Sequence, residues 1–263
     1  MRIVLCTYRY WGWEIVNRLY ENIYMDEEIT MPIGKDMKHF VGIITSAKKK
    51  EVDYINFLYG EIPVVELDDE KNDLIKELDK FKPDVVIFIG WSWVVPENDY
   101  DCLCIHPSPL PLYRGGSPIQ AQILAGEKTS KVTLFEMLGP TENIDSGDII
   151  AQRDYSLGGT LDDIFRQISV KGTDLIEGFV RDHKNNSVQF YPQDHSKATI
   201  CKRRRPEESE ITSEELQTKD AEYLYNKIRC LYSEKSKYPT AFIKAKDGKK
   251  LFLLEAKLED NDE

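Results

Sequence analysis

One histidine stands in a segment of unusual composition. His106 begins a loop that carries four prolines, two glycines and an arginine before Gln120. Prolines and glycines restrict the backbone path, so such a loop holds its side chains in defined positions. Histidine exchanges a proton near neutral pH, which makes His106 a candidate general acid or base. A lone histidine at a strand end is more often a core residue with satisfied hydrogen bonds, and that interpretation stays open at this point.

The surrounding segment is more specific than the histidine alone. Residues 104–120 read Cys-Ile-His-Pro-Ser-Pro-Leu-Pro-Leu-Tyr-Arg-Gly-Gly-Ser-Pro-Ile-Gln, and Asp145-Ser146-Gly147 follows further along the chain. This combination resembles the signature of the formyltetrahydrofolate-dependent formyltransferases, in which Asn-x-His-Pro-Ser-x-Leu-Pro-x-Tyr-Arg-Gly precedes Asp-x-Gly. The family includes enzymes that formylate methionyl-tRNA, glycinamide ribonucleotide and sugar nucleotides. The resemblance covers residues 80–155 well and the rest of the chain in outline.

The resemblance implies an active site of asparagine, histidine and aspartate. His106 would then assist proton transfer, and Asp145 would fix its tautomer and stabilise the imidazolium. Asp148 is a competing carboxylate, but the Asp-x-Gly spacing favours Asp145. Cys104 stands where the family has asparagine. Because alternate residues of a strand share a face, Cys104 would still border the site.

Cys104 changes the expected chemistry. An amine that attacks a formyl carbon produces a tetrahedral oxyanion, to which asparagine would donate a hydrogen bond and a thiol donates only weakly. Three interpretations stay open. Cys104 is a substitution tolerated in a working enzyme, a sign of lost or altered activity, or a nucleophile that pairs with His106 and forms a formyl thioester.

The resemblance also implies N10-formyltetrahydrofolate as the co-substrate and no metal. The pterin would lie along loops 90–96 and 137–145, mostly on backbone groups. The residues expected to bind it are Gly90, Trp91, Trp93, Val94, Val95, Met137, Gly139 and Asn143. Core packing is an equally supported interpretation of the two tryptophans. The four histidines show no clustered spacing of metal ligands.

A basic cluster late in the chain points to the acceptor. Residues 202–205 are Lys-Arg-Arg-Arg, which can form bidentate contacts with a diphosphate. The segment also resembles the one that follows the catalytic part of sugar-modifying members. We therefore expect a nucleotide-linked amino-dideoxysugar, with its amine on C4 or C3 and with dTDP, GDP or UDP as the nucleotide. The expected substrate-binding residues are Tyr8, Arg9, Trp11, Ser108, Arg114, Gly115, Arg203, Arg204, Arg205, Tyr223 and Tyr232. Tyr225 and Tyr238 are further candidates for stacking on a base.

Alternating strands and helices must position these residues. Val85–Ile89 is continuously apolar, as in a central parallel strand covered on both faces. The other predicted strands are residues 3–6, 40–45, 63–65, 103–105, 132–137 and 149–155, and the predicted helices are 13–24, 52–59, 73–81, 118–124 and 161–182. This order predicts a doubly wound, Rossmann-like α/β fold that binds ligands at the carboxyl ends of its strands.

The end of the chain has a different pattern. Residues 188–191 predict one more short strand, and the polar residues 202–213 predict a linker. A helix over 221–230 and strands over 241–245 and 251–256 follow. We therefore expect a formyltransferase catalytic domain over residues 1–199 and a small α+β subdomain over residues 200–263, since about 60 residues bury too little surface to form an independent domain.

Charge and composition narrow the function further. The 263 residues include 46 acidic and 35 basic ones, for a net charge of −11. Residues 200–263 contain 14 of each kind, so all the net negative charge lies in residues 1–199. A nucleic-acid binder normally presents a basic face, which argues against a transfer-RNA substrate. Methionyl-tRNA formyltransferase and a non-catalytic folate-binding paralogue remain the alternatives.

Location and assembly follow from simpler observations. No apolar run approaches the roughly 20 residues of a membrane helix. Five cysteines without metal-ligand spacing favour a reducing compartment. We therefore expect a cytoplasmic protein that binds no membrane. By analogy with relatives, we expect a homodimer formed through the C-terminal part.

Overall fold

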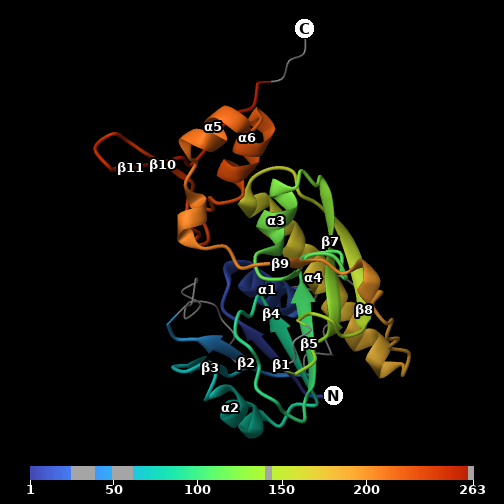
Figure 1. The fold of residues 1–263 in the computed structure, drawn as a ribbon. Helices are drawn as coiled ribbons and strands as arrows, with labels where there is room; N and C mark the ends of the chain where they lie inside the picture. Colours follow the sequence, from blue (N-terminus) through green and yellow to red (C-terminus); the bar gives the residue numbers. More distant parts are fainter. Residues whose placement is uncertain (25–38, 49–61, 140–143, 260–263) are drawn as a thin grey trace.

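A seven-stranded sheet runs through the molecule (Figure 1). The structure is a computed structural model that describes residues 1–24, 39–48, 62–139 and 144–259. The sheet has the order β3-β2-β1-β4-β5-β7-β8. Its strands are β1 (Ile3–Thr7), β2 (Phe40–Ser46), β3 (Val64–Leu67), β4 (Val85–Ile89), β5 (Asp101–His106), β7 (Thr129–Glu136) and β8 (Ile149–Ser156). Strands β1 to β5 pair in parallel. β7 pairs antiparallel with β5, and β8 pairs antiparallel with β7.

Helices cover both faces of this sheet, as the alternation of side chains in β1 requires. Ile3 and Leu5 belong to one buried cluster, with α1 (Tyr10–Tyr24) and α4 (Leu161–Lys184). Val4 and Cys6 belong to the other, with α2 (Leu74–Phe81). Successive residues of a strand point to opposite faces, so one all-buried strand supplies both cores. The predicted α/β fold is confirmed.

The long helix α4 is the main support of the larger core. It begins at a capping box in which Thr160 and Asp163 bond each other's backbone amides. It packs along α1 and beneath β7 and β8. Gly172 makes this approach close, because a Cβ there would lie 2.5 Å from the Ile15 side chain. α4 thus supports the sheet from one face, beside the strand β5 that ends at His106.

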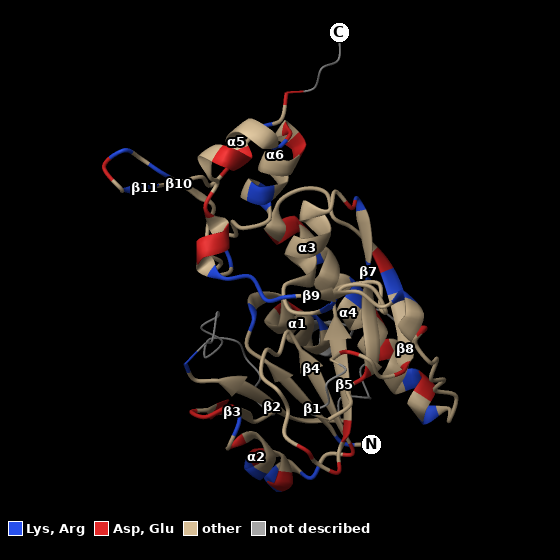
Figure 2. Ribbon diagram, viewed as in Figure 1, with Lys and Arg blue, Asp and Glu red and all other residues tan. Residues whose placement is uncertain are grey.

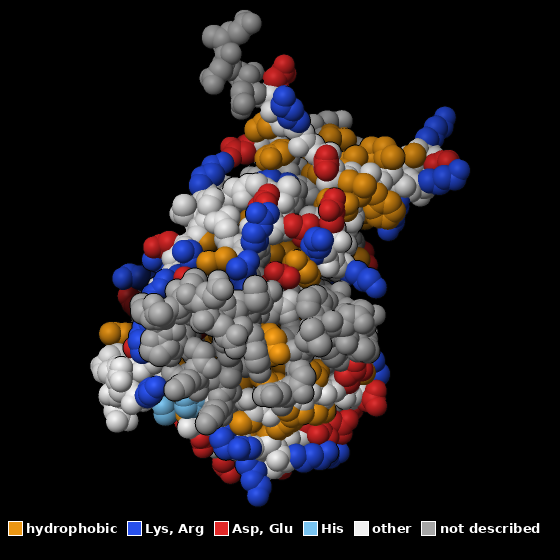
Figure 3. All heavy atoms as spheres, turned by 180° about the vertical axis from the view of Figure 1, so that it is seen from behind, with side chains coloured by type: hydrophobic (Ala, Val, Ile, Leu, Met, Phe, Trp, Pro, Cys, Tyr) orange, Lys and Arg blue, Asp and Glu red, His pale blue; other side chains and the backbone are white. Residues whose placement is uncertain are grey.

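The C-terminal part continues this core. Its elements are η4 (Pro206–Ser209), α5 (Ser213–Thr218), α6 (Ala221–Arg229), β10 (Phe242–Lys244) and β11 (Lys250–Phe252). Ile228, Leu231 and Ala241 join the cluster of α1 and α4, and α6 packs on α3 (Pro118–Leu124). The proposed boundary near residue 199 remains a prediction. Apolar side chains gather beside the β10–β11 hairpin on the rear face (Figure 3). Leu251 and Phe252 of β11 are more than half exposed.

One expectation about the chain was wrong. Residues 188–191 form only an isolated bridge between Tyr191 and Ile149, because Tyr191 alone meets the start of β8. The expected linker 202–213 contains one short 3-10 helix, η4, which Glu208 caps through its bond to the Arg205 amide. The predicted helix 52–59 lies outside the described residues. Among the described helices, none combines the length and the apolar character that crossing a membrane requires.

The order of the strands sets the place of a ligand. From β1 the chain moves to β2 and β3 on one side, and it then returns to β4 on the other side of β1. A crevice opens at such a switch point, outside the carboxyl ends of the strands. The loops after β1, β4 and β5 begin there.

Candidate active site

A cavity of about 710 Å³ lies at this point, a volume typical of small-molecule sites. Its walls come from the loops after β1, β4 and β5, the β7–β8 loop, residues 200–205 and the turn 237–239. Of the residues expected from the sequence, the cavity is lined by Arg9, Trp11, Gly90, Trp91, Trp93, Val94, Val95, Cys104, His106, Gly115, Met137, Gly139, Asp145, Arg203, Arg204 and Arg205. The topology therefore gathers most of the predicted residues around one space.

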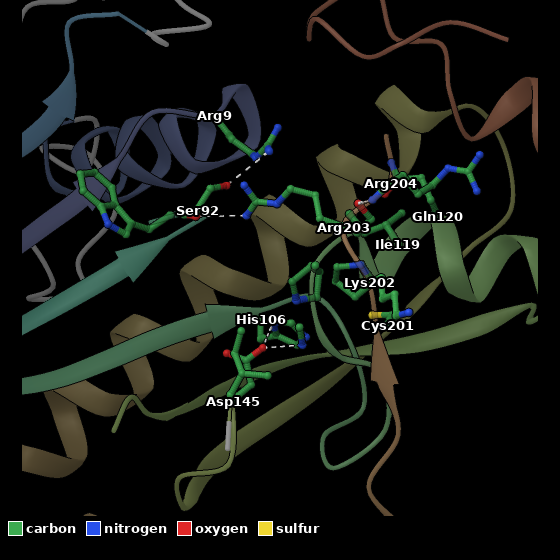
Figure 4. Close-up of a pocket in the computed structure, with 18 of the residues that line it drawn as sticks. Arg9, Ser92, His106, Ile119, Gln120, Asp145, Cys201, Lys202, Arg203 and Arg204 are labelled. Atoms are coloured by element: carbon green, nitrogen blue, oxygen red, sulfur yellow. Dashed lines mark hydrogen bonds and ion pairs between the residues drawn. The ribbon is translucent and has the colours of Figure 1, made fainter. Parts of the chain in front are cut away.

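His106 and Asp145 face each other in this cavity (Figure 4). His106 Nδ1 lies 3.6 Å from Asp145 Oδ2, and both side chains are largely buried. His106 Nε2 lies 3.0 Å from the carbonyl oxygen of Tyr113. A carbonyl only accepts, so Nε2 carries the hydrogen and the neutral ring presents its lone pair at Nδ1. The Tyr113 carbonyl, rather than Asp145, thus fixes the tautomer, and Asp145 stands where a proton on Nδ1 would be stabilised.

Asp145, not Asp148, is the carboxylate of the cavity. Its backbone has a φ of 52°, in the left-handed region that aspartate tolerates better than most residues. The Gly115 amide donates to Asp145 Oδ2 at 2.7 Å. Gly115 itself has a φ of 93°, and a Cβ there would lie 2.6 Å from the carbonyl oxygen of Cys201. Only glycine lets the motif loop, Asp145 and residue 201 come this close.

The proline-rich loop is fixed by hydrogen bonds to its carbonyls. Gln122 and Tyr155 donate to Pro107, Thr133 donates to Ser108, and Gln152 donates to Leu110. Ser108 is completely buried and donates to the Leu112 carbonyl. The structure therefore places Ser108 inside the loop, away from the cavity, because its hydroxyl is needed to close the turn.

Arg114 is also placed differently from its expected role. It is 5% exposed, does not line the cavity, and donates through Nε and Nη2 to the side-chain oxygen of Gln193. Nη2 also donates to His195 Nδ1. Burial lowers the pKa of the guanidinium, and the charge of Asp145 opposes that effect. Arg114 thus belongs to the framework behind the site.

Cys104 borders the cavity beside Asp145. Burial raises the pKa of its thiol well above 9, and the negative charge of Asp145 adds to this. Its Sγ lies 3.7 Å from the carbonyl oxygen of Ile105. A protonated thiol is a poor nucleophile, so this geometry argues against the formyl thioester.

Aromatic rings form another wall. Trp91 and Trp93 have ring centroids 4.8 Å apart, and Tyr8 packs 4.6 Å from Trp93. Tyr8 is 4% exposed, bonds Ser92 through its hydroxyl and supports this wall from behind rather than lining the cavity. Within the described chain, the buried Nε1–H of Trp91 makes no hydrogen bond.

Basic side chains line the part of the cavity next to this aromatic loop. Arg203 Nη2 donates to the Ser92 carbonyl at 3.1 Å, and Arg9 Nη2 lies 3.5 Å from the Ser92 hydroxyl oxygen (Figure 4). The Arg9 guanidinium also lies 5.5 Å from the ring centroid of Tyr238. Residues 202–205 continue the chain from β9 (Ile200–Cys201) to η4 and form a positively charged stretch (Figure 2).

Other expected residues lie elsewhere. Tyr223 bonds Glu215 and stacks beneath Lys219, and Tyr232 is not among the lining residues. Tyr223 belongs to the packing of the C-terminal part, which its spacing in the sequence could not distinguish from a binding face. Asn143 lies outside the described residues. Within the described ranges, no three His, Cys, Asp or Glu side chains are grouped as a metal site would require.

Sequence reasoning missed two residues that matter here: Lys237 lines the cavity, and Gln193 connects Arg114 to Asp145. Ser92, Leu138 and Ile144 also line the cavity; they lie within the loops 90–96 and 137–145 expected to bind the pterin, but were not singled out there. Tyr238, considered only for stacking, also lines it. The loop positions of Leu138 and Ile144, beside the Asp-x-Gly motif, were an available signal. Nothing in the local sequence singles out Gln193.

Comparison with known proteins agrees with this site. Residues 44–163, which include the proline-rich loop and Asp145, match the family model described as formyl transferase. This part of the chain is therefore similar to a formyl transferase domain. The matched residues include β4, β5 and the His106–Asp145 pair.

The relatives differ in their named substrates. A methionyl-tRNA formyltransferase of Lysinibacillus sphaericus is 32% identical over 183 residues, which cover 66% of this chain and 54% of that enzyme. The chain spans about half the length of the curated relatives it matches. A solved methionyl-tRNA formyltransferase of Clostridium thermocellum has a TM-score of 0.64, 25% identity and 96% coverage of both chains. A sugar N-formyltransferase of Shewanella has a TM-score of 0.70, 16% identity and 99% coverage of both, which is a likeness of fold.

The state of Cys104 can be tested directly. Because its thiol is protonated at neutral pH, we expect iodoacetamide at pH 7.5 to alkylate it at least about tenfold more slowly than free cysteine. Peptide mass spectrometry over time measures the rate, with Cys104→Ser identifying the peptide. A rate equal to that of free cysteine would mean an activated thiolate and would revive the covalent interpretation.

Proposed function

We propose that the chain transfers a formyl group from N10-formyltetrahydrofolate to the amine of a nucleotide-linked amino-dideoxysugar. The observation that carries the proposal is one cavity with the His106–Asp145 pair on one wall and Arg9 with Arg203 on the other. A cavity of about 710 Å³ suits small molecules. Its basic wall suits an acceptor that carries a diphosphate.

The lining residues fit the folate donor. Trp91 offers a flat ring, and Val94, Leu138 and Ile144 expose apolar side chains that line the same cavity. A pterin and a benzoyl group present flat apolar faces and polar edges, which match these surfaces. When bound, the donor supplies the formyl group; every other group in the proposed mechanism belongs to the acceptor or to this chain.

Proton transfer is assigned to His106. The acceptor amine adds to the formyl carbon to give a tetrahedral oxyanion, whose collapse breaks the bond from that carbon to the folate nitrogen. Nδ1 of His106 takes the proton that the amine loses and returns it to the departing nitrogen. Asp145 stabilises the imidazolium in between, and Tyr113 keeps Nε2 protonated throughout. Cys104 places only a weak donor beside the oxyanion, so His106 carries more of the catalysis than in an asparagine-containing site.

Methionyl-tRNA formyltransferase is the second candidate. It is favoured by the curated relatives and by the full-length match to the Clostridium thermocellum enzyme. Against it stands the net charge of −11, since the 46 acidic residues of the chain outnumber its 35 basic ones. Transfer-RNA binding relies on many phosphate contacts, which an acidic chain supports poorly.

A panel of acceptors tests the proposal. We expect the protein, with N10-formyltetrahydrofolate, to release tetrahydrofolate with at least one amino-dideoxysugar linked to dTDP, GDP or UDP. Folate absorbance measures the release, and a mass gain of about 28 Da identifies the product. Methionyl-tRNA is assayed in parallel. Formylation of methionyl-tRNA without sugar turnover would replace this proposal with the second candidate, and donor binding without any turnover would favour the non-catalytic paralogue.

The role of His106 makes a separate prediction. General acid–base catalysis contributes about 10²- to 10⁴-fold, so His106→Asn should lower kcat by at least about a hundredfold. The KM values and the thermal unfolding midpoint should stay close to those of the unaltered protein. Steady-state rates and a thermal melt measure both. An unchanged kcat would remove His106 from the mechanism.

Arg203 tests the acceptor side of the cavity. A charge-assisted hydrogen bond contributes about 1.5–3 kcal/mol, so Arg203→Met should raise the acceptor KM roughly tenfold or more and leave the donor KM unchanged. Arg153→Met is the matched control, because Arg153 is exposed on β8 and does not line the cavity. Equal acceptor KM values in the two variants would contradict the assignment of a phosphate contact to Arg203.

A further inference from the structure

Gln193 occupies an unusual position behind the site. It is 5% exposed, and all four hydrogen-bonding positions of its amide are used. Oε1 accepts from Arg114 Nε at 3.1 Å and from Arg114 Nη2 at 2.6 Å. Nε2 donates to the carbonyl of Asp145 at 3.0 Å and to that of Gly147 at 2.6 Å. A guanidinium only donates, so the amide orientation is determined by chemistry.

This arrangement joins a buried charge to the backbone of the candidate catalytic carboxylate. The Arg114 charge polarises the Gln193 amide, which makes its N–H groups stronger donors to the two carbonyls. One of these carbonyls belongs to Asp145, whose φ is in the left-handed region, and the other belongs to Gly147, two residues later. The Gly115 amide holds the other end of the residue, at Oδ2. Gln193 and Gly115 therefore constrain Asp145 from its backbone and from its carboxylate.

We propose that Gln193, held by Arg114, is a positioning residue that sets the distance between the Asp145 carboxylate and His106. The inference rests on the proposed function, in which this pair holds the transferred proton. His106 and Asp145 are separated by 3.6 Å, so a small shift of the turn would change their interaction substantially. Neither Gln193 nor Arg114 lines the cavity, so both act through Asp145.

Two substitutions separate the contacts of Gln193. Gln193→Met keeps the length and removes every hydrogen bond. Gln193→Glu keeps an acceptor for Arg114 but points carboxylate oxygen at the two carbonyls. Both should lower kcat about 10- to 100-fold, the range typical of residues that orient a reacting group, with the acceptor and donor KM unchanged. Full activity of Gln193→Glu would overturn the inference, since the amide donors would then be dispensable.

A double-mutant cycle distinguishes positioning from general support. If Gln193 acts through Asp145, then Gln193→Met should cost less than about threefold in an Asp145→Asn background. A merely structural residue would cost the same in both backgrounds, and that result would overturn the inference. Gln167→Met is the matched control: Gln167 also bridges two segments, by accepting from the Ser156 amide, and lies outside the cavity.

Hydrogen exchange supplies a readout that needs no substrate. Backbone amides of residues 144–148 should exchange faster in Gln193→Met and Gln193→Glu than in the unaltered protein or in Gln167→Met. Unchanged exchange in that segment would overturn the inference. If the unaltered protein formylates none of the acceptors, the proposed function fails, and the exchange result still decides whether Gln193 holds the Asp145 turn.

Discussion

The parallel pairing of β6 (Arg114–Gly115) with β9 joins the proline-rich loop to a segment far along the chain. Arg114 donates to the Thr199 carbonyl, and Gly116 donates to that of Cys201. Residues 193–205 contact three of the segments that form the cavity. Gln193 contacts the Asp145 turn, residues 199–201 hold the loop, and Arg203 reaches Ser92. One segment of the chain thereby contacts the Asp145 turn, the loop that orients His106, and the basic wall.

Charge within the cavity follows from this arrangement. The part of the chain before residue 200 carries the whole net negative charge, whereas residues 202–205 bring four positive side chains across it. An anionic acceptor is attracted to the basic wall and repelled by Asp145, so its neutral amine rather than its phosphates faces His106. Asp145 would thus help to orient the acceptor by repulsion alone, while its own contact is with His106.

The sequence predicted the centre of the sheet well because β1 and β4 are buried on both faces, which leaves an apolar run such as Val85–Ile89. It also predicted that His106 and Asp145 lie at one site, through a motif long enough to be specific, and the structure places them 3.6 Å apart. It assigned Ser108 and Arg114 to substrate because they belong to that motif. A motif does not distinguish residues that contact a ligand from those that hold the loop, and both proved to satisfy buried carbonyl or amide groups. Gln193 was missed because its role depends on three segments that meet only in the fold.

The central claim is that a folate donor and a nucleotide-linked acceptor occupy one cavity on either side of His106. Equilibrium binding with 5-formyltetrahydrofolate, a stable isomer of the donor, and each nucleoside diphosphate tests it most directly. Simultaneous binding of one donor and one nucleotide per chain, with the nucleotide weakened by Arg203→Met, is the predicted result. Mutually exclusive binding, or nucleotide binding unaffected by that substitution, would contradict the claim.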